Sequence, residues 1–138
     1  MRNKVRKRRC ESGQSAVELA LTLPLLILLI CGMIEMGWLS ATRLALDNIT
    51  REGVRAGIVA TSASDNTSGV IARINEMKPD YMTQTLGISV SYSNASNFRD
   101  GDITVVTNYD LPPLTPLTAI FTTDGVFHLR SECTMKMS

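Results

Sequence analysis

The feature that most constrains this chain is a strongly basic N-terminus placed directly before a long apolar stretch. Six Lys or Arg residues fall within the first nine positions, and residues 19–34 contain no charged side chain. As an α-helix, residues 16–39 would extend about 36 Å, enough to cross a hydrocarbon layer of about 30 Å. The sequence therefore predicts a membrane-spanning helix and excludes a plain cytosolic globule.

The charge distribution predicts the orientation of this helix. Residues 1–13 hold six basic residues and one acidic residue, net +5, whereas residues 14–138 hold eight and twelve, net −4. A basic run before an apolar helix favours a cytoplasmic N-terminus and an extracytoplasmic C-terminus, and this interpretation is favoured over nucleic-acid binding. A cleavable secretory signal has a shorter apolar region and a small-x-small site, but Leu39 stands where a small residue is expected. We expect a single-pass anchor in the cytoplasmic (inner) membrane.

Two acidic residues lie inside the apolar segment, Glu18 near its start and Glu35 near its end. An acid in a membrane span is costly unless it is paired or near an interface. Glu35 lies beside Trp38 at the expected outer interface, where Trp is commonly found, so an interfacial position accounts for it. Glu18 can be explained by the inner interface, but its neighbours offer another explanation.

Glu18 follows Gly13 by five positions, between the basic leader and the apolar helix. This order resembles the processing site of type IV prepilins, in which a membrane aspartyl peptidase cuts after the Gly and the fifth mature residue is Glu. The resemblance implies cleavage between Gly13 and Gln14. Glycine suits such a site because the absence of a Cβ lets a protease approach the backbone closely.

A wider set of three motifs lies in the first half of the chain: Gly13-Gln14-Ser15-Ala16-Val17-Glu18-Leu19-Ala20-Leu21, Leu23-Pro24-Leu25 and Arg51-Glu52-Gly53-Val54-Arg55-Ala56. Together these motifs resemble the TadE family, the minor pilins or pseudopilins of the tight-adherence (Flp) pilus. Gln14 stands where ordinary type IV pilins commonly have Phe, and Leu19 stands where the major Flp pilin has Tyr. The resemblance is closest over residues 13–60 and favours a minor component over the bulk subunit.

The resemblance implies a structural role in adhesion and biofilm formation. It implies four kinds of protein partner: the prepilin peptidase, the inner-membrane assembly platform, other minor pilins and the major Flp pilin. Membrane lipid would surround the spanning helix. The expected organisation is a basic prepilin leader over 1–13, a transmembrane helix over 14–39, an extracytoplasmic stalk helix over 40–60 and an α+β outer domain over 61–138.

Small residues recur every three or four positions on one face of the expected stalk helix, which allows close packing either against other pilin stems or against the protein's own domain. The polar stretch 61–69 is expected to end this helix. Apolar spacing then predicts a short helix with Ser68 as its cap and Pro79 at its end. The small-residue face consists of Ala41, Ala45, Ile49, Gly53, Ala56 and Ala60, and the apolar positions of the short helix are Val70, Ile71, Ile74 and Met77.

Three later segments alternate apolar and polar residues as half-buried strands do. A hairpin loop over residues 94–102 joins the first two, and residues 111–117 are expected to be extended before a helical turn at 119–121. The fold class is therefore α+β, a pilin-like long helix with a small antiparallel sheet against it. The expected inward faces are Ile88, Val90 and Tyr92; Ile103, Val105, Thr107 and Tyr109; and Phe127, Leu129, Ser131, Cys133 and Met135.

The sequence offers little chemistry. No His, Cys and carboxylate cluster has metal-ligand spacing, no Gly-rich phosphate loop precedes a helix, and no nucleophile has a nearby base. His128 is expected to be exposed. Asp100 and Asp102 fit a turn better than a cation site. We expect no catalytic residues, no cofactor and no metal.

The three cysteines lie in unrelated settings. Cys10 is in the basic leader, Cys31 is in the apolar segment and Cys133 is near the C-terminus, so no internal disulfide framework is expected. Cys133 is interpreted as a small buried hydrophobe or, alternatively, an intermolecular thiol. An alternative to the pilin interpretation is an uncleaved single-span membrane protein whose outer domain binds a ligand or acts as a sensor.

Overall fold

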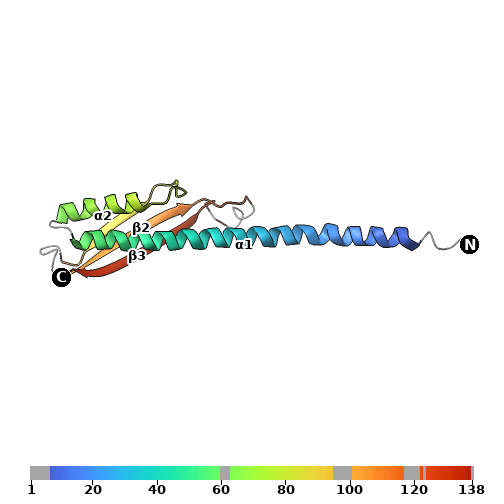
Figure 1. Ribbon diagram of the computed structural model, residues 1–138, viewed down its shortest axis with the longest axis horizontal. Helices are drawn as coiled ribbons and strands as arrows, with labels where there is room; N and C mark the ends of the chain where they lie inside the picture. The colour runs from blue at the N-terminus through green and yellow to red at the C-terminus, as the bar shows by residue number, and fades with distance from the viewer. Residues whose placement is uncertain (1–6, 60–62, 95–100, 117–121, 123, 138) are drawn as a thin grey trace, which may run out of the picture.

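The structure is a computed structural model in which residues 7–59, 63–94, 101–116, 122 and 124–137 are described. Helix α1 (Lys7–Val59) is continuous over 53 residues, and at 1.5 Å per residue it is about 80 Å long. Helix α2 (Ala63–Met77) and the strands β1 (Gly87–Tyr92), β2 (Gly101–Leu111) and β3 (Phe127–Met137) form a head beside its C-terminal half. Figure 1 shows the N-terminal half of α1 projecting alone from this head. The predicted α+β class is confirmed.

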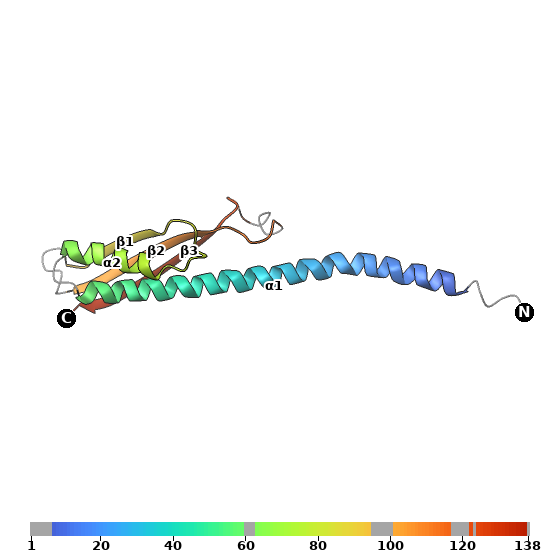
Figure 2. The ribbon, with the colours of Figure 1, turned by 45° about the horizontal axis from the view of Figure 1, so that its top comes forward.

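Among the described residues, no other element packs against the projecting half of α1. Its leucine and isoleucine side chains are exposed, and the helix is long and apolar enough to cross a membrane. Pro24 lies inside it and has no N–H to offer to the carbonyl one turn earlier. Figure 2 shows α1 curved along this half, as expected for a helix that contains a proline.

The sheet is an antiparallel meander with the strand order β1-β2-β3. Pairing aligns Val90 with Val105 and Val105 with Cys133, so the three inward faces predicted from the sequence form continuous rows across the sheet. Both helices pack on this one face, α1 over β2 and β3 and α2 beside β1, as Figures 1 and 2 show. The opposite face carries exposed residues such as Ser89 and Arg130.

The core lies between the two helices and the sheet, and all described elements contribute to it. The largest fully buried side chain is Tyr109 of β2. The two buried threonines Thr50 and Thr107 join α1 to β2 through hydroxyls 2.5 Å apart. The buried hydrophobic residues are Leu46, Ile49, Val54, Val70, Ile74, Met82, Leu86, Ile103, Val105, Tyr109, Leu111, Leu129 and Met137.

The prediction that the small-residue face of α1 is buried was only partly correct. Ile49 and Gly53 are buried, but Ala41 is exposed and Thr42 is buried one position later. Thr42 can be buried because its hydroxyl donates to the Trp38 carbonyl at 2.9 Å. Of the two packing alternatives, the structure shows α1 packed against the protein's own head.

The start of α2 differs from the prediction. The helix begins at Ala63, inside the stretch expected to be turn-rich, so Ser68 lies within the helix and is not its cap. Ser, Asn and Asp are weak helix formers, but packing of Val70 and Ile74, both 0% exposed, stabilises the helix by tertiary contact. Its end at Met77, before Pro79, was predicted correctly.

Two loop predictions lie partly outside the described residues. β1 and β2 are antiparallel neighbours as expected, and the Ser93 N–H donates to the Asp102 carbonyl at 3.0 Å. Asp102 thus belongs to β2 rather than to the predicted turn, while Asp100 lies outside the described residues. The helical turn expected at 119–121 is also outside them.

Candidate functional site

The residues of the predicted processing site all lie on the projecting half of α1. Gly13, Gln14 and Glu18 are exposed and helical. A Cβ built on Gly13 would meet nothing within 4 Å. Gln14 and Glu18 are one helical turn apart and therefore lie on the same face. No other part of the described chain covers these residues.

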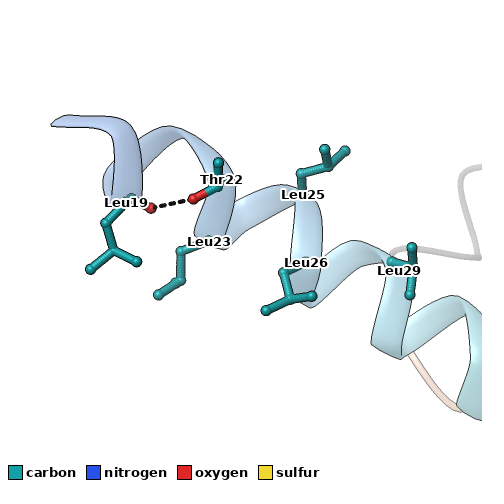
Figure 3. Close-up of a pocket in the computed structure, with 6 residues that line it drawn as sticks. All are labelled: Leu19, Thr22, Leu23, Leu25, Leu26 and Leu29. Atoms are coloured by element: carbon teal, nitrogen blue, oxygen red, sulfur yellow. Dashed lines mark hydrogen bonds between the residues drawn. The ribbon is translucent and has the colours of Figure 1, made fainter. Parts of the chain in front are cut away.

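Residues just after Glu18 form a shallow apolar hollow on the surface of α1, which Figure 3 shows. Leu19, Leu23 and Leu26 extend from one side of the helix, at the spacing of one helical face. The one polar side chain among the lining residues, Thr22, donates its hydroxyl to its own helix, at 2.9 Å from the Glu18 carbonyl and 3.3 Å from the Leu19 carbonyl. A surface with no free polar group to orient a ligand suits an acyl chain or another apolar helix.

Glu35 is the most constrained acidic residue of α1, with only 4% of its surface exposed. Its Oε1 accepts the Leu114 N–H at 2.9 Å, and its Oε2 accepts both the N–H and the hydroxyl of Thr115 at 3.1 Å. The donors belong to the segment that follows β2. Glu35 therefore joins the C-terminal end of the apolar part of α1 to the head.

Sequence reasoning missed this role for Glu35. It explained the residue by an interfacial position alone, whereas the structure shows a carboxylate with three hydrogen bonds. A local signal did exist: an acid in an apolar helix requires a partner. The sequence did not identify that partner, because Leu114 lies 79 residues away along the chain.

One helical turn after Glu35, an aromatic pair joins α1 to the segment after α2. The rings of Trp38 and Tyr81 have centroids 5.1 Å apart and planes inclined by 58°. Tilted pairs of this kind are a favourable arrangement for aromatic rings. The pair adds a second contact between the head and the same level of α1.

The polar face of the sheet carries ion pairs that are open to solvent. His128 Nδ1 lies 2.6 Å from Asp110 Oδ1, and Asp124 Oδ2 is 3.9 Å from the other ring nitrogen. The hydrogen bond to Asp110, and then its negative charge, raise the pKa of His128 above 6.5. The prediction of an exposed His128 is confirmed.

This surface has no feature of an enclosed catalytic or metal centre. Arg130 and Glu132 pair with each other at 2.9 Å on the same exposed face. Within the described part of the chain, no group of three His, Cys, Asp or Glu side chains is arranged to hold a metal ion. Cys31 and Cys133 are half-buried free thiols.

Comparison with known proteins assigns the N-terminal part of this chain. The family model described as TadE-like protein matches residues 13–55, from the glycine of the predicted cleavage site to Arg55. The matched segment lies wholly within α1 and contains both Glu18 and Glu35. No curated protein and no solved structure matches the chain. Over this segment, which is less than half of the chain, the sequence is similar to the TadE-like family.

Proposed function

We propose that this protein is a minor pilin of a tight-adherence (Flp) pilus, which supports pilus assembly in adhesion and biofilm formation. The observation that carries the proposal is a TadE-like match that begins at Gly13 on an exposed apolar helix. A pilin needs such a helix first to hold it in the bilayer and then to pack among other subunits. The proposed role is structural, and no catalytic step is assigned to the protein.

Processing is the first step of the proposed function. We expect a prepilin peptidase to remove residues 1–13, so that the mature protein starts at Gln14. Support comes from the exposure of Gly13 and from the absence of any neighbour within 4 Å of a Cβ built there. A membrane protease could reach this position without displacing the head.

N-terminal sequencing of protein from cells that express the matching peptidase tests this step. We expect a Gln14 terminus in the wild type and accumulation of the precursor for Gly13→Leu. Gly32→Leu is the matched control, because Gly32 lies on the same helix and likewise has no neighbour within 4 Å of a built Cβ. An intact Met1 terminus would contradict the proposal and favour the uncleaved single-span receptor or sensor.

The proposed membrane arrangement places 14–39 in the bilayer, 40–60 as a stalk and 61–138 outside the cytoplasmic membrane. The six basic residues before the span support a cytoplasmic N-terminus. In intact cells that lack the peptidase, and so retain Cys10, a membrane-impermeant thiol reagent should modify Cys133 and spare Cys10. Reaction of Cys133 in the unfolded protein is the control for its reactivity. Labelling of Cys10, with Cys133 protected until lysis, would reverse the orientation.

Glu18 is proposed to pair with the new α-amine of Gln14, either in the same subunit or in a neighbouring pilin. Opposite charges about 4 Å apart attract by about 4 kcal/mol at an effective dielectric constant of 20. An acid at the centre of a spanning helix costs about 2.5–3.5 kcal/mol on insertion scales. The attraction is of the same size as the cost, so pairing gives a reason for Glu18 to be tolerated.

The test replaces Glu18 with Gln, which keeps its shape and removes its charge. We expect Glu18→Gln to insert and to be at least partly cleaved, but to lose crosslinks to the other minor pilins, the major pilin and the assembly platform. Glu76→Gln is the control for the same chemical change, because Glu76 is an exposed acid on α2. Wild-type crosslinking yields in cleaved Glu18→Gln protein would exclude the pairing role.

A further inference from the structure

The segment that follows β2 is held against α1 at a depth close to the membrane boundary. Glu35 binds this segment through Leu114 and Thr115 and lies one residue beyond the uncharged run 19–34. That run is about 24 Å long as a helix, and a span needs about 30 Å, so a few flanking residues must also enter the hydrocarbon layer. Glu35 therefore lies within a few residues of the outer boundary if α1 spans the membrane, as the proposed function requires.

Figures 1 and 2 show the same arrangement from the side of the head. The described residues directly after β2 extend toward the N-terminal half of α1, and the loop after α2 lies at the same end of the head. The opposite end carries the C-terminus of α1. The end that holds residues 112–116 and Tyr81 is thus the one that faces the bilayer.

The backbone of residues 112–116 has no unpaired N–H group. Pro112, Pro113 and Pro116 have no N–H, and the N–H groups of Leu114 and Thr115 are both donated to Glu35. Every amide donor of the segment is thus either absent or bonded within the protein. An irregular segment usually avoids lipid because its free N–H and C=O groups are costly to bury, and here the part of that cost that comes from N–H groups is removed.

The side chains of the same region suit the boundary between headgroups and acyl chains. Leu114 is 57% exposed although it is apolar, and no charged residue occurs from position 111 to position 123. Tyr81 is 43% exposed beside Trp38. Trp and Tyr are enriched at membrane interfaces, where an apolar ring and a polar tip are both accommodated.

We propose that residues 112–116, with Trp38 and Tyr81, form a second membrane contact seated at the headgroup boundary. The partner is the lipid surface around the protein's own spanning helix. Glu35 is the positioning residue, because it fixes the depth of this contact relative to α1. The head is then held to the bilayer at two places. The inference rests on the proposed membrane anchor.

A fluorescence experiment on the full chain tests this contact. The three native cysteines are replaced by alanine, and one cysteine is introduced and labelled with an environment-sensitive nitrobenzoxadiazole group. The label is placed at Leu114, at Leu28 in the expected span, or at Ser89 on the exposed face of the sheet. Each protein is reconstituted into vesicles of phosphatidylcholine and phosphatidylglycerol, with nitroxide-labelled lipid or aqueous iodide as quencher.

We expect the label at Leu114 to emit at shorter wavelength than the label at Ser89. Shallow nitroxide lipid should quench it strongly, and iodide should quench it several-fold less than it quenches the Ser89 label. Glu35→Ala should increase the quenching of the Leu114 label by iodide, while the Leu28 label should stay in lipid. Glu76→Gln should change neither label.

Two results would overturn the inference, and they differ. If the Leu114 label is as open to iodide as the Ser89 label while the Leu28 label is protected, the second contact does not exist and the anchor stands. If the Leu28 label is also open to iodide, the anchor itself fails, and the second contact fails with it. An unchanged Leu114 label in Glu35→Ala would remove the positioning role of Glu35.

Discussion

Replacing Gly53 with alanine tests how closely α1 and α2 are packed. A Cβ at this position would lie 2.6 Å from both Cγ1 and Cδ1 of Ile74. Carbon atoms prefer separations of about 3.5–4.0 Å, so the new atom would overlap by about 1 Å. Ile74 is 0% exposed and cannot turn into solvent. Either the Ile74 side chain must change its rotamer within the core, or one of the two helices must shift.

The expected magnitude follows from two opposing terms. Overpacking of a core costs about 1–3 kcal/mol, and alanine is favoured over glycine in a helix interior by about 1 kcal/mol. The Gly53→Ala variant should therefore be less stable than the wild type by about 0–2 kcal/mol. Gly69→Ala on α2 is the control, because a Cβ there meets nothing within 4 Å. It should be more stable by about 0.5–1 kcal/mol.

The two variants should differ by about 1–3 kcal/mol, and each kcal/mol shifts the melting temperature of a head of this size by about 4–8 °C. Thermal unfolding of the full chain in detergent, followed by near-ultraviolet circular dichroism, measures the difference. Ile74→Ala in the Gly53→Ala background should cost less than in the wild type, because it removes the overlapping atoms. An equal rise in melting temperature for Gly53→Ala and Gly69→Ala would refute the close contact.

Two further predictions concern polar pairs of the head. The Thr50 hydroxyl donates to the Leu46 carbonyl at 2.7 Å, so the Thr107 hydroxyl donates to Thr50. Thr50→Val should lower the free energy of unfolding by about 1–3 kcal/mol, because it leaves the buried Thr107 hydroxyl unpaired. Urea unfolding should show Thr50→Val with Thr107→Val to be less destabilised than the two single changes added together. His128 should titrate above its ordinary pKa of 6.5 by NMR, and Asp110→Asn should lower that pKa toward the ordinary value. Because folding raises this pKa, the His128–Asp110 pair should stabilise the folded state below about pH 6.5, and this stabilisation should disappear as the pH rises through the pKa of the folded state. A folded-state pKa at or below 6.5 would contradict the pairing.

The strands were predictable because their alternation has a single physical cause. One face of the sheet packs on the helices and the other faces solvent. Ile103 and Val105 are therefore 0% exposed, while Thr104 between them is partly exposed. The alternation of apolar and polar residues in the sequence follows directly from this one-sided burial. The register across the sheet then follows from matching the inward rows.

The helices were less predictable because their buried faces depend on contacts distant in sequence. The sequence of residues 63–68 predicts a turn, but these residues belong to α2, whose Val70 and Ile74 are buried in the core. Thr42 and Thr50 are polar and were not predicted to be buried. They lie on the buried face because their hydroxyls donate to carbonyls of their own helix. Gly13, Gln14 and Glu18 are predicted as site residues by resemblance, and their roles stay a prediction. The sequence did not predict the Glu35 contact, which requires a partner that only the fold brings near.

The way the core is shared between α1 and the sheet constrains how the head can be made in the cell. Leu46 and Val54 lie in the helix that leaves the ribosome first, and they belong to the same buried core as residues of β3, which ends at Met137. At about 5–20 residues per second, the intervening chain of roughly 80 residues takes about 4–16 s to synthesise. During this time the apolar face of α1 has no sheet to cover it, while the basic residues hold the other end of the helix at the cytoplasmic side under the proposed orientation. Under the proposed orientation, export and folding of this protein are coupled, and a holdase outside the cytoplasmic membrane or the translocation machinery would have its greatest effect before β3 emerges.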